Sequence, residues 1–207
     1  MLRVLDLEKR TPETQKASAN AISDEAELSK LLEGLGSKKC AVRYKNFKAV
    51  YIISEDHPEV LYPKWDFFEN MLQSKNNTLI FYAIHILANL TKVDSAGKFE
   101  KIFNQFYDIL NGDALVPACH VAYVSSKIVA AKPVLTESIT GKLLDLDKAS
   151  YKHKELVQAN ALKSFSDYFE KIQNKETVIA LAKELQKNKS SRARKESNEF
   201  LKKWKIS

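Results

Sequence analysis

Apolar residues recur every three or four positions along most of this chain, which is the spacing of an amphipathic helix. Strict alternation of apolar and polar residues, the pattern of a β-strand, is almost absent. Five Gly and five Pro are too few for the frequent turns of a β-protein. The pattern therefore predicts an all-α protein.

The most apolar stretch covers residues 77–94, with the sequence NTLIFYAIHILANLTKVD. A helix that is apolar on nearly every side must be buried between other elements. The amphipathic segment WDFFENMLQSKN precedes it and ends in a polar turn, so the two predict a helical hairpin. The apolar residues at helical spacing within the stretch are Leu79, Ala83, Ile86, Leu87 and Leu90.

The same hairpin pattern recurs along the chain. Residues 1–23 are expected to form an N-terminal segment with a short capping helix, which Thr11 caps and Pro12 begins. A repeat domain is expected over 24–207, with helix pairs at about 24–57, 60–94, 96–131, 133–172 and 174–206. The first helices end at positions 34 to 41 residues apart, which is typical of two-helix repeats: Leu35, Leu72, Leu110, Leu144 and Leu185.

Some local features can be predicted within these pairs. Ser23 or Asp24 is expected to cap the helix that follows, and Ser95 the helix after the break at residues 94–97. Val42 is expected on the buried side of its helix together with Phe47. The first pair should end at residues 57–58, where a proline prevents continuation, and the fourth pair departs from the others by a longer polar joint, DKASYKHK.

Three segments carry a family pattern: LLEGLGSKKCAVRYKNFKAV, MLQSKNNTLIFYAIHILANL and, more weakly, LQKNKSSRARKESNEFL. Each has a Leu-rich first helix, a short polar turn, and a second helix with an early Arg43 or Arg192 or a small inner residue such as Ala83 or Ser197. Over about 24–206 the chain resembles HEAT repeats or the related armadillo repeats. Tetratricopeptide repeats fit less well, because their Trp-Leu-Gly-Tyr signature is missing. The resemblance implies a right-handed α-solenoid of about five helix pairs, whose second helices line a concave face that commonly holds protein or nucleic acid.

Positive charge is concentrated near the C-terminus. The chain has a net charge of +7, and residues 183–205 hold nine Lys and Arg against three Glu. A basic surface attracts acidic proteins, nucleic acid or lipid head groups. The candidate residues for an acidic partner or nucleic acid are Arg43, Lys45, Lys48, Arg192, Arg194 and Lys195.

Nothing in the sequence has the spacing of a catalytic, metal or cofactor site. The four His are scattered, no Cys-x-x-Cys or HExxH occurs, and no glycine-rich phosphate loop is present. Cys119 and His120 are adjacent, but neighbours on a helix do not face each other. Two distant cysteines, no signal peptide and no run long enough for a membrane span predict a cytoplasmic protein.

Two functions are consistent with this sequence. The first is a non-enzymatic scaffold that holds a protein partner in the concave groove. The alternative is a basic DNA- or RNA-binding protein related to the HEAT-like alkylpurine DNA glycosylases, which use aromatic residues and an Asp in a basic concavity. Trp65 and Asp66 are the candidates for that chemistry, with Tyr44 or Trp204 to stack on bases. However, Asp66 also suits the first turn of a helix, where the dipole favours a carboxylate.

Overall fold

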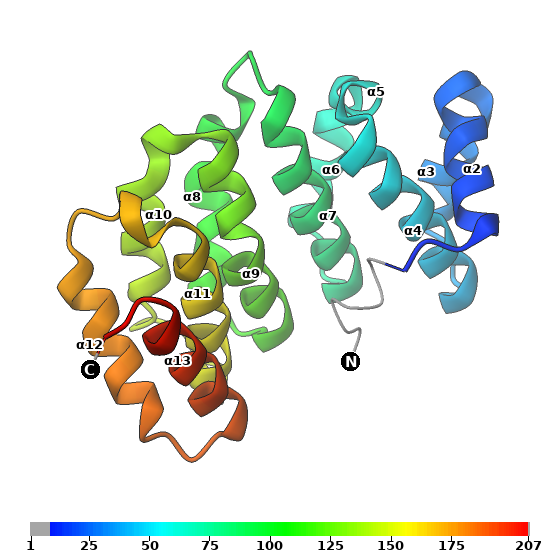
Figure 1. Ribbon diagram of the computed structural model, residues 1–207. Helices are drawn as coiled ribbons and strands as arrows, with labels where there is room; N and C mark the ends of the chain where they lie inside the picture. Colours follow the sequence, from blue (N-terminus) through cyan, green and yellow to red (C-terminus); the bar gives the residue numbers. More distant parts are fainter. Residues whose placement is uncertain (1–8, 207) are drawn as a thin grey trace. The chain divides into compact units, whose positions relative to one another are not determined.

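The computed structural model describes residues 9–206, and all regular structure in that range is helical (Figure 1). The predicted all-α class is confirmed. The chain divides into two compact units, and the boundary in the sequence lies between Ala96 and Gly97. We call them the N-terminal unit and the C-terminal unit and describe each by itself.

The N-terminal unit contains helices in the order α2 (Pro12–Ser23), α3 (Glu25–Gly34), α4 (Cys40–Asp56), α5 (Pro58–Leu61), α6 (Trp65–Leu72) and α7 (Asn77–Leu90). Short 3₁₀ helices follow α5 (Tyr62–Lys64) and α7 (Thr91–Val93). The long helix α4 packs against both α2 and α7, and α6 packs against α7. Second helices of successive hairpins therefore lie next to one another.

The C-terminal unit repeats this arrangement with α8 (Lys98–Asp108), α9 (Leu115–Ala131), α10 (Thr136–Leu144), α11 (Lys154–Tyr168), α12 (Lys175–Gln186) and α13 (Ser191–Lys203). Its 3₁₀ helices are Ile109–Asn111, Pro133–Leu135 and Phe169–Lys171. The helix α11 packs most extensively, against α9 on one side and α13 on the other (Figure 1). The helices α9, α11 and α13 therefore form a layer of second helices.

Short helical segments precede several hairpins. Pro58–Leu61 and Tyr62–Lys64 come directly before α6, Pro133–Leu135 before α10, and Phe169–Lys171 before α12. A short first helix followed by two longer ones is the three-helix arrangement that distinguishes armadillo from two-helix repeats. At these positions the structure is closer to the armadillo variant than to plain helix pairs.

Apolar burial explains why α7 is the most hydrophobic helix. Every residue from 81 to 90 is buried. On the side facing α4, the rings of Phe47 and Tyr82 stack with 3.9 Å between centroids. His85 is 1% exposed and packs edge-on against Phe81 at 4.8 Å, so it belongs to this core.

The residues that cap the helix N-termini agree in part with those predicted from the sequence. Thr11 and Thr14 form a reciprocal capping box at α2, and Asp24 rather than Ser23 caps α3 by accepting from the amide of Ala26. The prediction that Ser95 caps α8 is wrong. Gly97 occupies that position with a φ of 64°, a left-handed conformation that glycine adopts without a steric penalty.

One further local prediction is corrected and another is extended. Val42 is 42% exposed, not buried. It lies five residues before Phe47, which at 3.6 residues per turn places it about 140° away around α4. Pro58 ends α4 as expected, but it also begins α5, because proline is compatible with the first turn of a helix.

The joint between α10 and α11 is partly buried although its sequence is polar. Leu146, Ala149 and Tyr151 are each less than 9% exposed. The Tyr151 hydroxyl donates to the carbonyl of Leu110 at 2.6 Å, and burial raises its pKa to about 12. The joint is therefore fastened to the turn between α8 and α9.

Candidate functional site

The six basic residues predicted as a binding site divide between the two units. Arg43, Lys45 and Lys48 lie on α4 in the N-terminal unit, while Arg192, Arg194 and Lys195 lie on the first two turns of α13 in the C-terminal unit. Within each group the three residues lie on the same helix, but their side chains have different neighbours.

Arg43 and Arg194 have the same structural task. The Arg43 guanidinium donates to the carbonyl of Ser37 at 2.8 Å, and that of Arg194 donates at 2.8 Å to the carbonyls of Asn188 and Lys189. Both arginines therefore satisfy carbonyl groups of the turn that precedes their helix. By its contacts the counterpart of Arg43 is Arg194, and Arg192 is left for another role.

The three candidate lysines make exposed side-chain contacts within their own unit. Lys45 pairs with Glu13 of α2 at 2.6 Å, and Lys195 lies 3.8 Å from Glu199 one turn along α13. Lys48 lies 6.0 Å from the centre of the Tyr44 ring. Exposed pairs of this kind contribute little to stability, so a partner could replace them at small cost.

Arg192 crosses from α13 to α11. One of its terminal nitrogens donates to the side-chain oxygen of Asn160 at 2.9 Å, and the Asn160 amide donates in turn to the carbonyl of Leu156 at 2.9 Å. Asn160 is only 4% exposed, whereas Arg192 is exposed. A buried amide thus fixes one edge of a guanidinium whose remaining donors lie at the surface.

Beneath Arg192 lie two buried groups of α9, Cys119 and His120. Burial raises the pKa of the Cys119 thiol to about 11 and lowers the pKa of His120 to about 4. The positive charge of Arg192 adds to the effect on His120. At neutral pH neither a thiolate nor a charged imidazole forms there, so this pair lacks an activated nucleophile.

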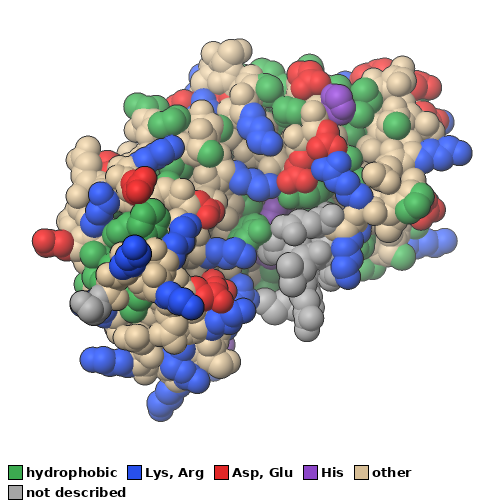
Figure 2. All heavy atoms as spheres, viewed as in Figure 1, with side chains coloured by type: hydrophobic (Ala, Val, Ile, Leu, Met, Phe, Trp, Pro, Cys, Tyr) green, Lys and Arg blue, Asp and Glu red, His purple; other side chains and the backbone are tan. Residues whose placement is uncertain are grey.

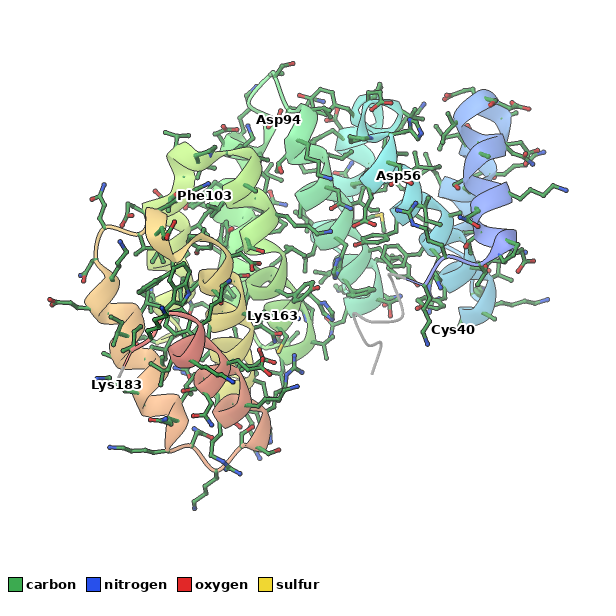
Figure 3. The ribbon with its side chains drawn as sticks, in the orientation of Figure 1. Cys40, Asp56, Asp94, Phe103, Lys163 and Lys183 are labelled. Atoms are coloured by element: carbon green, nitrogen blue, oxygen red, sulfur yellow. The ribbon has the colours of Figure 1, made fainter. Side chains whose placement is uncertain are left out.

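Two more lysines reach between the second helices. The Lys163 ammonium of α11 lies 5.1 Å from the centre of the Tyr123 ring on α9, and Figure 3 labels Lys163 on this side of α11. The Lys203 ammonium of α13 donates to the carbonyl of Ser166 on α11 at 2.6 Å. We call the surface made by the exposed sides of α9, α11 and α13 the second-helix face of the C-terminal unit.

A pocket of about 250 Å³ opens between the C-terminal parts of α9 and α11. Pockets that hold drug-sized ligands are usually larger, about 300–1,000 Å³, and mostly apolar. This one can take a side chain of a partner more readily than a cofactor. Its lining residues are Ser126, Lys127, Ala130, Asp167, Tyr168 and Lys171.

The net charge of the protein belongs to the C-terminal unit. Residues 1–96 contain thirteen Lys and Arg and thirteen Asp and Glu, whereas residues 97–207 contain twenty against thirteen. The second set alone therefore accounts for the whole charge of +7. Figure 2 shows Lys and Arg side chains gathered over α13 and the turn between α12 and α13.

The residues proposed for glycosylase-type chemistry are mostly occupied in packing. Trp65 is fully buried and its indole donates to Glu69 at 3.0 Å, so its ring is not at the surface. Asp66 is exposed in the first turn of α6, where the helix dipole favours it. Trp204 packs against Phe169 at 5.0 Å, and Tyr44 is half-buried beside Phe47.

Sequence reasoning missed Asn160, Lys163 and Tyr123. A partial signal was present in α11: Asn160, Lys163 and Asp167 are polar at spacings of three and four, which places them on one side of the helix. In the described part of the chain, residues 9–206, no cluster of three potential metal ligands is found. Within the same range no helix is both long and apolar enough to span a membrane. The cytoplasmic location stays a prediction.

Comparison with known proteins identifies the fold. No protein-family model and no curated protein sequence matches the chain. Among solved structures, it is similar to an engineered protein of the Northeast Structural Genomics Consortium, with a TM-score of 0.54 and 17% identity over 93% of this chain and 87% of that one. It is also similar to a designed armadillo repeat protein, with a TM-score of 0.50 and 17% identity over 99% and 98% of the two chains. The protein therefore has a HEAT- or armadillo-like helical repeat fold of the all-α solenoid class, as predicted.

Proposed function

We propose that this protein is a non-enzymatic interaction scaffold that binds a protein partner on the second-helix face of its C-terminal unit. Repeat folds of this class commonly use the surface of stacked helices to hold extended partners. The observation that carries the proposal is the ordered polar surface over α9, α11 and α13. There Arg192, Lys163 and Lys203 each reach from their own helix to the next.

The order of this surface matters for affinity. Side chains that are already held in place lose little conformational entropy when a partner arrives, so more of the contact energy is kept as affinity. Arg192 and Lys163 are already held by contacts in the unbound protein. This arrangement supports a role in binding rather than only in keeping the surface solvated.

Site-specific photo-crosslinking tests this function. A diazirine-bearing lysine analogue that keeps the ammonium is placed at position 163, and in a matched protein at position 183 on α12, which Figure 3 also labels. In an extract of the source cells, position 163 should give protein adducts that survive nuclease treatment, and position 183 should not. The proposal is contradicted by no protein adduct at 163, or by equal adducts at both positions.

Nucleic-acid binding is the second candidate, and the net charge of +7 within residues 97–207 is the observation that favours it. Such binding would weaken steeply as salt rises, because counterions are released from the phosphates. In the crosslinking experiment it would appear as adducts at position 163 that nuclease removes.

A further inference from the structure

We propose that the partner segment bound on the second-helix face is acidic and extended, with carboxylates held by Arg192 and Lys163. This inference rests on the proposed function and specifies the chemistry of the partner. It is argued from the geometry of these two cations, from the charges around them and from the surface available between α9 and α11.

Arg192 is placed to bind a carboxylate. One terminal nitrogen is engaged by Asn160 at 2.9 Å, and the side chain is otherwise exposed. A guanidinium has five N–H donors in a planar fork, so four remain for a partner or for water. Paired donors of this kind match the two oxygens of a carboxylate, and the buried Asn160 keeps the group in one orientation.

Lys163 supplies a second positive charge on the helix that holds Arg192. It lies three residues after Asn160 on α11, which is a rise of about 4.5 Å along the helix axis. Successive side chains of an extended chain point to opposite faces, and residues two apart lie on one face about 6.6 Å apart. Two carboxylates at that spacing could reach Arg192 and the flexible Lys163 side chain together.

The pocket between α9 and α11 extends this site. Lys163 is followed on the same side of α11 by Asp167, which lines the pocket together with Lys127 and Lys171. Two lysines and one aspartate leave its rim with a positive balance. The volume of about 250 Å³ is suited to one side chain of the same segment.

The distribution of negative charge favours a peptide over nucleic acid. Asp167 lies on α11 beyond Lys163, and Glu196 and Glu199 follow Arg192 at spacings of four and seven on α13. A nucleic-acid strand carries a phosphate at every step and would meet these carboxylates, whereas a protein segment can place uncharged residues there. Among the described residues of the C-terminal unit no aromatic side chain is exposed, and the half-buried ring of Tyr123 already lies under the Lys163 ammonium, so little aromatic surface is left for stacking bases.

Fluorescence anisotropy with the full chain tests the proposal. The probes are a labelled twelve-residue peptide of alternating Glu and Ser (the Glu-Ser peptide), a neutral Gly-Ser peptide of equal length and a twelve-nucleotide single-stranded DNA, each measured across a salt series. The variants are Arg192→Ala and Lys163→Glu, with Lys183→Glu on α12 as the control of equal charge change. Thermal unfolding of each variant verifies that it is folded.

We expect the Glu-Ser peptide to bind more tightly than both other probes. Lys163→Glu should weaken this binding by about tenfold or more and Arg192→Ala by a similar factor, because each removes a directed contact to a carboxylate. Lys183→Glu should change the affinity by less than about twofold, since remote exposed charges are screened by salt.

Three results would overturn the proposal. Equal losses in Lys163→Glu and Lys183→Glu would mean general attraction by net charge. Tighter binding of DNA with the same dependence on Arg192 and Lys163 would assign the face to nucleic acid. If neither peptide bound, or if both bound equally, the proposal of an acidic partner would be rejected. The scaffold function would not be rejected with it, because that function is tested separately by protein adducts at position 163 in the crosslinking experiment.

Discussion

Arg192 shows how one side chain can link packing with recognition. Its partner Asn160 is buried and hydrogen-bonded to its own helix. One edge of the guanidinium is therefore held by Asn160, and the rest of the group lies at the surface. Arg194, two residues later, faces the turn and is used for structure. These two arginines of one helix thus have different tasks, because residues two positions apart point about 160° away from each other around the axis.

Two of the predicted residues show what a sequence can and cannot settle at this scale. Arg194 was predicted as a binding residue from its charge alone, and the charge is present, but its donors are taken up by two carbonyl groups. Asn160 carries no charge and was not selected. Its importance comes from a bond to a residue 32 positions away, which only the packing of α11 on α13 creates.

The buried imidazole of His120 gives a prediction about pH. Burial and Arg192 lower its pKa from 6.5 to about 4 in the folded protein. As pH falls below 6.5 the unfolded chain takes up a proton that the folded chain refuses until about pH 4. The stability from this residue is therefore complete above pH 6.5 and is lost between about 6.5 and 4, by at most about 3 kcal/mol.

Urea unfolding at pH 7 and pH 4.5 checks this expectation by comparison of the wild type with His120→Gln. The decrease in unfolding free energy between the two pH values should be smaller in the variant. The pair of Arg10 and Asp56, which lowers the pKa of Asp56, is unchanged in both proteins and cancels from the comparison. Parallel decreases would contradict the assignment to His120.

At the scale of helices, α3 and α4 approach each other closely at Gly34. A Cβ atom at Gly34 would lie 1.8 Å from the side-chain amide nitrogen of Asn46 and 2.6 Å from its Cγ. The absence of a side chain at Gly34 therefore leaves the space that the Asn46 side chain occupies. The sequence identified this position as part of a Leu-rich first helix, but not the reason for its glycine.

Substitution of Gly34 by alanine should lower the free energy of unfolding by about 1–3 kcal/mol, because Asn46 must move. Removal of the Asn46 side chain beyond Cβ in the double variant Gly34→Ala/Asn46→Ala should recover most of that loss. The control is Gly141→Ala in α10, where nothing lies within 4 Å of the new Cβ. It should raise stability by about 0.5–1 kcal/mol through a better helix propensity.

Chemical denaturation of these variants measures the differences directly. The packing argument would be contradicted if Gly34→Ala were as stable as the wild type, or if the double variant showed no recovery relative to the single one. A loss of stability in Gly141→Ala would instead show that α10 has a constraint other than helix propensity.

Helix boundaries show why patterns predict elements better than their ends. The period of the apolar residues predicted the position of α7 and its burial. It did so because these residues form the core. The start of α8 was predicted at Ser95 from capping preference, yet Gly97 takes the position with a left-handed backbone. Caps depend on the local path of the chain, and several residues near a break can serve equally well.

At the scale of the whole molecule, charge is distributed unevenly between the two units. Residues 1–96 are balanced, and residues 97–207 carry the entire excess of seven positive charges. Composition can show this segregation, and it is the part of the candidate site that the sequence predicts well. Which cations share a surface follows instead from the contacts of α9, α11 and α13.

The repeat fold itself could be predicted from the sequence because each hairpin has an apolar side that it cannot cover alone. Stacking on the next hairpin is the simplest way to cover it, and the regular spacing of Leu35, Leu72 and Leu110 indicates that stacking. The short helices that precede α6, α10 and α12 were not predicted. Each is only three or four residues long, too short for a period to be recognised.

Hydrogen exchange of the full chain, with and without the Glu-Ser peptide, tests the central claim most directly. The account predicts slower amide exchange on binding in α9, α11 and α13, with α8, α10 and α12 unchanged, and loss of this protection in Lys163→Glu. Protection confined to the first helices, or to the N-terminal unit, would contradict the claim that the second-helix face of the C-terminal unit is where this protein holds its partner.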